Sequence, residues 1–179
     1  MKVLVVVDMQ NDFITGSLGT PEAQAIVPNV KKKIDEAVKN GDLIIYTQDT
    51  HSVDYLNTRE GKKLPVEHCI YKTYGWQIPE ELMVSKDYEY VEFIDKFTFG
   101  SELLPTLIKS YELSSSFDEI ELSGLCTEIC VVSNALMLKA AFYDSYEISV
   151  DATCCAGVTP ETHEAALKTM EMCQINVKR

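Results

Sequence analysis

The chain switches repeatedly between short apolar runs and longer stretches in which apolar residues recur every three or four positions. Short runs bounded by turn residues predict strands, and the longer periodic stretches predict helices. The predicted strands are residues 3–7, 43–47, 90–94, 117–123, 147–150 and 175–177. The predicted helices are residues 28–40, 102–111, a segment from 127 onward, and 160–172. Alternation of this kind predicts an α/β fold with a mostly parallel sheet and helices on both faces.

The first predicted helix has clear end signals, and one long segment lacks any periodic pattern. Pro28 fits the first position of a helix that Asn40-Gly41 ends. Residues 49–78 show no sustained period and predict a long loop, which inside a compact domain usually has a function. We find no internal repeat, low-complexity tract or linker, so residues 1–179 are expected to form one domain.

The net charge of the chain argues against some classes of binding partner. The net charge is −12, whereas nucleic acids and anionic membranes require a basic surface. No apolar run approaches the roughly 18 residues of a membrane span, and we see no secretory leader. We therefore expect a cytoplasmic protein whose six cysteines are reduced, with a small-molecule substrate and no nucleic-acid or membrane partner. The oligomeric state stays open, and a homo-oligomer is compatible with the sequence.

Reactive side chains follow the predicted strands. Asp8 comes after the first strand, Asp95 and Lys96 after the third, and Cys130 after the fourth. Because the carboxyl ends of parallel strands meet at one edge, we expect these groups to converge there. A carboxylate, an ammonium and a thiol together suit nucleophilic attack on a carbonyl. Taken singly, each has an ordinary interpretation: a polar cap, a solvated lysine, or a cysteine that fills core space.

The position of Cys130 predicts a reactive thiol. With Thr127 as the N-cap, Cys130 falls at the third position of a helix, where free N–H groups and the positive dipole end favour a thiolate. We therefore expect a depressed thiol pKa. The cysteines expected in or near the core are Cys69, Cys154, Cys155 and Cys173.

The long loop carries candidate metal ligands. Asp49 and His51 are two residues apart at its start, and Glu60 and His68 follow within it. Oxygen and imidazole ligands suit zinc, manganese or iron. The other interpretation is a set of unrelated polar loop residues. His163, the third histidine, is expected on the surface of the last helix.

Six segments carry a resemblance to the isochorismatase-like cysteine hydrolases. They are residues 8–13 (DMQNDF), 47–51 (TQDTH), 67–69 (EHC), 95–96 (DK), 124–130 (GLCTEIC) and 156–158 (AGV). The resemblance implies a Rossmann-like three-layer sandwich with a six-stranded sheet, and a catalytic triad of Asp8, Lys96 and Cys130. It also implies a cis peptide bond between Leu125 and Cys126, and an oxyanion hole formed by the N–H groups of Cys126 and Cys130.

Within that superfamily the chain is most similar to nicotinamidases, enzymes of NAD salvage that convert nicotinamide to nicotinate and ammonia through a thioester. This similarity implies one divalent transition metal ion, with zinc the first candidate and manganese or iron also compatible. The implied ligands are Asp49, His51, His68 and a further glutamate, Glu60, and Phe13 is expected to pack on the substrate ring.

Two positions depart from the nicotinamidase pattern. Pro65 stands where many nicotinamidases have tryptophan, and Cys126 stands where alanine is commoner. Trp76 is a candidate for the missing aromatic wall. The alternatives are another small-amide or carbamoyl hydrolase, or a non-catalytic relative that uses Cys130 as an oxidisable thiol. Asp8 and Lys96 favour a hydrolase, since a redox sensor needs no general base.

Overall fold

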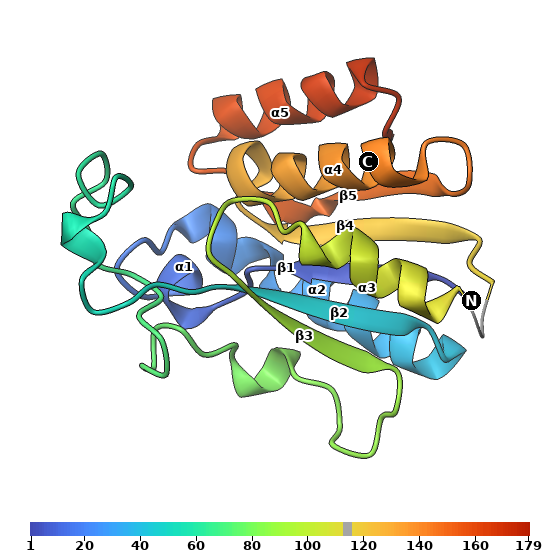
Figure 1. Cartoon of the computed structure of the whole chain (residues 1–179), viewed down its shortest axis with the longest axis horizontal. Coiled ribbons are helices and arrows are strands. Elements are labelled where there is room, and N and C mark those ends of the chain that lie inside the picture. Colours follow the sequence, from blue (N-terminus) through green and yellow to red (C-terminus); the bar gives the residue numbers. More distant parts are fainter. Residues whose placement is uncertain (113–115) are drawn as a thin grey trace.

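The computed structural model describes residues 1–112 and 116–179. Its centre is a six-stranded, all-parallel sheet with strand order β3-β2-β1-β4-β5-β6 (Figure 1). The strands are β1 (Val3–Val7), β2 (Leu43–Asp49), β3 (Val91–Lys96), β4 (Glu119–Leu125), β5 (Glu147–Ala156) and β6 (Asn176–Lys178). The predicted α/β fold is therefore confirmed.

Helices cover both faces of the sheet. The helices are α1 (Asn11–Ile14), α2 (Pro21–Asn40), α3 (Leu103–Tyr111), α4 (Val132–Phe142) and α5 (Pro160–Met172). Leu4 and Val6 of β1 share a core with α2, whereas Val3, Val5 and Val7 share a core with α3, α4 and α5. Burial on both faces explains why β1 is a continuous apolar run. Within the described ranges, we find no helix with the length and apolar character that crossing a bilayer would need.

Helix α2 begins seven residues earlier than the sequence predicted. Thr20 is its N-cap and accepts a hydrogen bond from the Ala23 N–H at 3.0 Å, and Pro21 takes the first helical position. Pro28 lies inside the helix on its exposed side, so the prediction of a start at Pro28 is wrong. Thr20-Pro21 is itself a signal for the start of a helix, and the helix begins there rather than at Pro28.

Strand β5 continues past the predicted end at residue 150, through a register shift opposite Leu122 and Gly124. Gly124 has φ +120°, and a Cβ there would lie 2.0 Å from the Val7 carbonyl oxygen, so only glycine fits between these strands. The extension brings Gly157 and Val158 to the carboxyl edge of the sheet, where they line a cavity.

Candidate active site

Asp8, Lys96 and Cys130 meet at the carboxyl edge of the sheet. The Lys96 Nζ lies 2.7 Å from Asp8 Oδ2 and 3.4 Å from Cys130 Sγ. The other Asp8 oxygen accepts a hydrogen bond from the Thr47 hydroxyl at 2.7 Å. Asp95, by contrast, is exposed, because neighbouring residues of β3 point to opposite faces. The structure thus brings together the carboxylate, the ammonium and the thiol that the sequence singled out.

These three side chains are shielded from water. Asp8 is 0% exposed and Lys96 is 2% exposed. Burial raises the pKa of Asp8 above its ordinary value, against the opposing effect of Lys96. Burial alone would lower the pKa of the Lys96 ammonium, but Asp8, Cys130 and Asp49 raise it. An ammonium therefore stands beside a carboxyl group whose affinity for a proton is increased.

The prediction of a depressed Cys130 pKa is wrong. Burial raises the pKa of this thiol well above its usual range, and the Asp8 carboxylate adds to the effect. Cys130 lies not at the third position of an α-helix but in a π-helical turn, η3 (Thr127–Val131), which precedes α4. Its N-cap is Cys126, and Thr127 is buried, with its Oγ1 2.8 Å from Nδ1 of the half-buried His163. His163 is therefore half-buried on α5 rather than fully exposed as predicted.

The other cysteines divide into two groups. Cys69, Cys154 and Cys155 are buried, as predicted, whereas Cys173 is exposed at the end of α5. The peptide bond between Leu125 and Cys126 is cis, and Cys126 lines the same cavity as Cys130.

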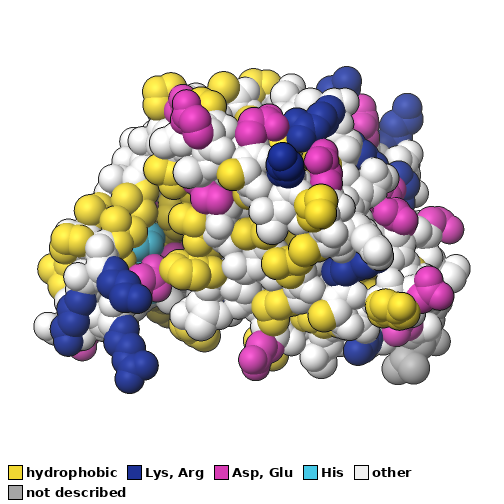
Figure 2. All heavy atoms as spheres, turned by 90° about the horizontal axis from the view of Figure 1, so that it is seen from above, with side chains coloured by type: hydrophobic (Ala, Val, Ile, Leu, Met, Phe, Trp, Pro, Cys, Tyr) yellow, Lys and Arg dark blue, Asp and Glu magenta, His cyan; other side chains and the backbone are white. Residues whose placement is uncertain are grey.

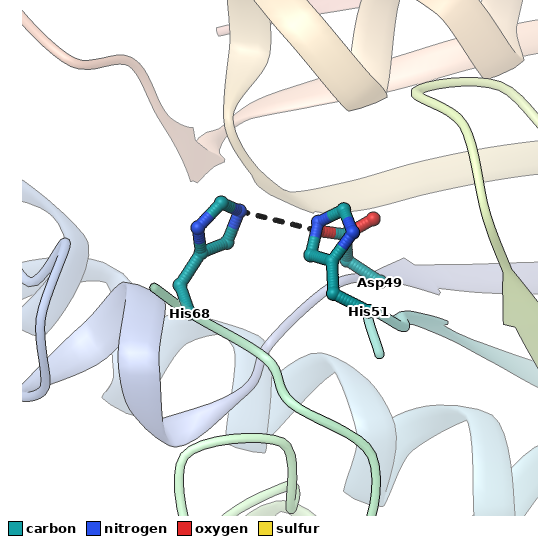
Figure 3. A group of neighbouring side chains, drawn as sticks. All are labelled: Asp49, His51 and His68. Carbon is teal, nitrogen blue, oxygen red and sulfur yellow. Dashed lines mark ion pairs between the residues drawn. The ribbon is translucent and has the colours of Figure 1, made fainter. Parts of the chain in front are cut away.

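Asp49, His51 and His68 form a compact group beside Lys96. One potential ligand atom from each lies within 4.8 Å of the others (Figure 3). Asp49 Oδ2 is 2.9 Å from His51 Nε2 and 3.5 Å from His68 Nε2. Burial disfavours the charge on Asp49, but His51, His68 and Lys96 hold its pKa well below the usual range. Glu60 lies outside this group, with Oε1 3.7 Å from His51 Nε2.

The donor atoms of this group fit a divalent cation. The Nδ1 of His68 lies 2.8 Å from the Val66 carbonyl oxygen, to which it donates, so Nε2 is the nitrogen that faces Asp49 and can bind a cation once it gives up its proton. The Nε2 of His51 is buried, and its approach to Asp49 Oδ2 at 2.9 Å lacks the geometry of a hydrogen bond, so among the described residues no hydrogen bond satisfies it. Two imidazole nitrogens and a carboxylate facing one another are a ligand set that zinc commonly uses.

The loop is folded so that its two histidines face each other. His51 pairs with Ile70 as an isolated parallel bridge, and its N–H donates to the Cys69 carbonyl at 3.0 Å. The ring of Tyr55 packs against both imidazoles, with centroids 4.6 Å from His51 and 4.9 Å from His68. Sequence reasoning missed Tyr55, although a large aromatic residue four positions after the candidate ligand His51 in a polar loop was an available signal.

Gln10 and Trp76 make hydrogen bonds that hold the backbone around Asp49 in place. The Gln10 side chain accepts from the Asp49 N–H at 2.7 Å and donates to the Asp49 and Trp76 carbonyls at 2.9 and 2.8 Å. The indole N–H of Trp76 donates to Thr50 Oγ1 at 2.9 Å. Trp76 is absent from the cavity lining, so it does not supply the aromatic wall considered from the sequence.

An apolar cavity of about 260 Å³ connects the thiol with the histidine group. Asp49, His68, Cys126 and Cys130 line it on the polar side. Its hydrophobic lining consists of Phe13, Leu18, Ala23, Leu64, Phe99, Leu125, Ile129 and Val158. Figure 2 shows a histidine side chain set among hydrophobic ones on one face of the molecule. None of the described lining residues is Lys or Arg.

Comparison with known proteins identifies the family of this chain. Residues 2–178 match the family described as "Isochorismatase domain". A protein named "probable inactive nicotinamidase" from Arabidopsis thaliana is 28% identical over 98% of this chain and 89% of its own length. The Saccharomyces cerevisiae nicotinamidase is 25% identical over 99% of both chains. The crystal structure of pyrazinamidase of Pyrococcus horikoshii in complex with zinc superimposes with a TM-score of 0.82 and 26% identity, over 99% of this chain and 98% of that one. This chain belongs to the isochorismatase family.

Proposed function

We propose that this protein is a metal-assisted cysteine amidohydrolase that converts nicotinamide to nicotinate and ammonia through a thioester. The observation that carries the proposal is the position of the Lys96 ammonium, 2.7 Å from Asp8 and 3.4 Å from Cys130 Sγ. Cys130, Asp49 and His68 line one cavity, so a single small ring amide can reach the thiol and the proposed metal ligands together.

Asp8 serves as the general base. It accepts the Cys130 proton while the sulfur forms a bond to the amide carbonyl carbon, and Lys96 offsets the charge of the intermediate. Burial raises the pKa of the Cys130 thiol, which disfavours a free thiolate, and it raises the pKa of Asp8, which makes this carboxylate a stronger base. Asp8 then returns the proton to the leaving nitrogen, the C–N bond breaks, and ammonia departs. Water then attacks the thioester carbon while Asp8 accepts a proton from it. The C–S bond breaks, the acid product departs, and Asp8 returns the proton to the Cys130 sulfur.

The backbone N–H groups of Cys126 and Cys130 are our candidates for the oxyanion hole. Two aligned donors in a water-excluded site stabilise the tetrahedral intermediate more than they stabilise the planar amide. The role needs no Cys126 side chain, so the departure from alanine at this position leaves it intact.

Asp49, His51 and His68 would hold the metal ion, with zinc the first candidate and Glu60 the candidate fourth ligand. A bound divalent ion supplies a Lewis-acid contact for the pyridine nitrogen, which orients the ring. Phe13 lines the cavity with its ring centroid 5.6 Å from that of His68, so it is placed to pack on the same ring.

The cavity favours an uncharged substrate. A carbamoyl amino acid would bring a carboxylate into an apolar lining without Lys or Arg among its described residues. The nearby Lys96 is already paired with Asp8 at 2.7 Å and Asp49 at 3.2 Å. A neutral aromatic amide leaves no charge unpaired, and this argues for nicotinamide over carbamoyl substrates.

The test is ammonia release by the zinc-loaded protein from nicotinamide, an aliphatic amide and a carbamoyl amino acid, with Cys130→Ala as the control. We expect turnover of nicotinamide to exceed the others by at least about 10⁴-fold, the discrimination that a site built for a polar contact provides. Preference for the carbamoyl amino acid would replace the nicotinamidase assignment with a carbamoyl hydrolase. Failure to turn over any amide by folded, metal-loaded protein would support the non-catalytic alternative.

A further inference from the structure

The helical turn that carries Cys130 is wider than an α-helical turn. The Val131 N–H donates to the Cys126 carbonyl at 3.1 Å, and the Val132 N–H reaches the Thr127 carbonyl, each five residues back. Turns of this kind are rare and occur often at functional sites. The hydrogen bonds within this turn are less regular than those of an α-helix. Contacts from outside the turn therefore help to fix the position of the Cys130 backbone.

Asn134, one turn further along, makes such contacts. It is fully buried, and its Nδ2 donates to the Cys130 carbonyl at 2.8 Å and to the Phe99 carbonyl at 3.2 Å. Its Oδ1 accepts from the Ser101 N–H at 2.9 Å. A primary amide has two N–H donors, and both are used here. One side chain therefore joins the backbone of Cys130 to the segment that follows β3.

That segment, residues 97–101, contributes to the site in two ways. The Thr98 carbonyl accepts a hydrogen bond from the Lys96 Nζ at 3.2 Å. Phe99 forms part of the cavity wall, although its side chain is 47% exposed. The segment also lies close against α4, because a Cβ on Gly100 would come 2.5 Å from Met137 Sδ. Its position thus affects both the ammonium and the shape of the cavity.

From these contacts we infer that Asn134 is a positioning residue for the reaction. It holds the segment at residues 97–101 against the Cys130 turn, so that Lys96 stays beside the sulfur and Phe99 stays against the cavity. Asn134 touches none of the reacting atoms. The inference rests on the proposed function for the identity of the reaction. The hydrogen-bonded connection that Asn134 makes between the Cys130 turn and residues 97–101 can be tested without substrate.

Asn134→Ser is the sharpest variant. A serine hydroxyl in a helix can donate to the carbonyl four residues back, which here is that of Cys130. It is too short to replace the hydrogen bonds to Phe99 and Ser101, so only the connection between the Cys130 turn and residues 97–101 is lost. Asn134→Ala removes all three bonds and serves as the second variant. Ser149→Ala is the matched control, since it removes another buried side-chain hydrogen bond, to Glu119, far from the site.

We expect Asn134→Ser to lower kcat for nicotinamide at least tenfold while KM changes less than threefold, with a larger loss in Asn134→Ala. The pH profile of Cys130 alkylation by iodoacetamide should move its midpoint upward by at least half a pH unit, because Lys96 no longer stays beside the sulfur. Easier access for the reagent would scale the whole profile without moving its midpoint. Ser149→Ala should lower only Tm.

A lower Tm in Asn134→Ser with unchanged kcat and an unchanged alkylation midpoint would overturn the inference and leave Asn134 a core hydrogen-bonding residue. If the parent protein releases no ammonia from any amide, the proposed function fails, and the alkylation midpoint alone then decides the role of Asn134. An unmoved midpoint in both Asn134 variants would reject it in that case too.

Discussion

Two clusters of charged side chains lie at different places on the same sheet. Burial raises the pKa of a carboxyl group in both clusters, but the neighbouring charges outweigh burial at Glu119 and do not outweigh it at Asp8. The first is the Asp8, Lys96 and Asp49 cluster beside Cys130. The second, which we call the α2-side network, consists of Lys2, Lys33, Lys178, Glu119, Glu121 and Asp151. In the network, burial opposes ionisation of Glu119, but Lys178, Lys2 and Ser149 hold its pKa at about 2. Beside Cys130, burial prevails and the pKa of Asp8 is raised.

The difference follows from how the charges are matched. In the described part of the chain, three ammonium groups of the α2-side network face three carboxylates, and the network keeps contact with water. Among the residues described by the structure, Lys96 is the only ammonium group that faces the buried Asp8 and Asp49 carboxylates and the Cys130 thiol. Matched charges support the folded state, whereas an under-matched buried set keeps protons available for chemistry. Residue type alone does not separate the two clusters.

The largest expected effect is loss of the thiol. Cys130→Ala should reduce amide hydrolysis by at least about 10⁴-fold, the scale of losing a nucleophile, while Tm stays near that of the parent. Cys126→Ala should keep most of the activity, since its proposed contribution is a backbone N–H. Steady-state ammonia release and thermal unfolding of both variants provide the measurement. Equal losses in the two variants would contradict the assignment of the nucleophile.

Asp8→Asn should lower kcat by roughly 10²–10⁴, the usual contribution of a general base, because an amide cannot accept the thiol proton. It should also change the pH dependence of stability. The folded pKa of Asp8 is raised, so its contribution is fully present below the unfolded carboxyl pKa and is lost as pH rises through the folded value.

The parent protein should therefore lose stability relative to Asp8→Asn as pH increases from about 4, the unfolded value. Urea unfolding of both proteins across pH 4 to 8 measures this difference. A difference that grows in favour of the parent with pH would show that Lys96, not burial, dominates the Asp8 carboxyl group.

Removal of the metal should have a smaller and more selective effect. Chelation, or His51→Ala, should raise KM for nicotinamide at least tenfold and KM for an aliphatic amide less than threefold, because only the ring offers a nitrogen ligand. Tm should fall, since an ion that binds only the folded state stabilises it. Metal analysis of protein purified without chelator should give one divalent ion per chain. Equal KM changes for both amides would remove the ring-orienting role.

The smallest effect on activity belongs to the α2-side network. Glu119→Gln should leave kcat unchanged and lower the free energy of unfolding by about 1–2 kcal/mol at pH 7, after allowance for solvent screening. Because the folded pKa of Glu119 is depressed to about 2, this stabilisation is present above the unfolded value and is lost as pH falls toward 2. Asp118→Asn is the control, because that exposed pair with the N-terminus should contribute little. Reduced kcat in Glu119→Gln would mean that the two clusters are not independent.

The convergence of Asp8, Lys96 and Cys130 was predictable because it depends on strand ends alone, and Val3–Val7 marks its strand without ambiguity. Asp49, His51 and His68 were predictable by the same reasoning together with the family resemblance. The pKa of Cys130 was not, because it depends on how deeply the thiol is buried and on which carboxylate faces it.

The π turn at Thr127–Val131 could not be predicted either. Its sequence has the apolar spacing of an ordinary helix, and the wider turn depends on contacts with distant segments. Asn134 was passed over for the same reason. A single asparagine on a helix gives no local signal, and its partners Phe99 and Ser101 are more than thirty residues away.

Asp49 presents its two oxygens to two different neighbours. One is 3.2 Å from the Lys96 ammonium, and the other faces the histidine nitrogens at 2.9 and 3.5 Å. Substitutions at Asp49 should therefore have a different effect on activity from substitutions at His51 or His68, although the three side chains lie next to one another. Changes at His51 or His68 could be rescued by raising the nicotinamide concentration, whereas changes at Asp49 could not. For the same reason, a lineage that abandoned the metal could replace its histidines freely and would still be selected to keep this aspartate.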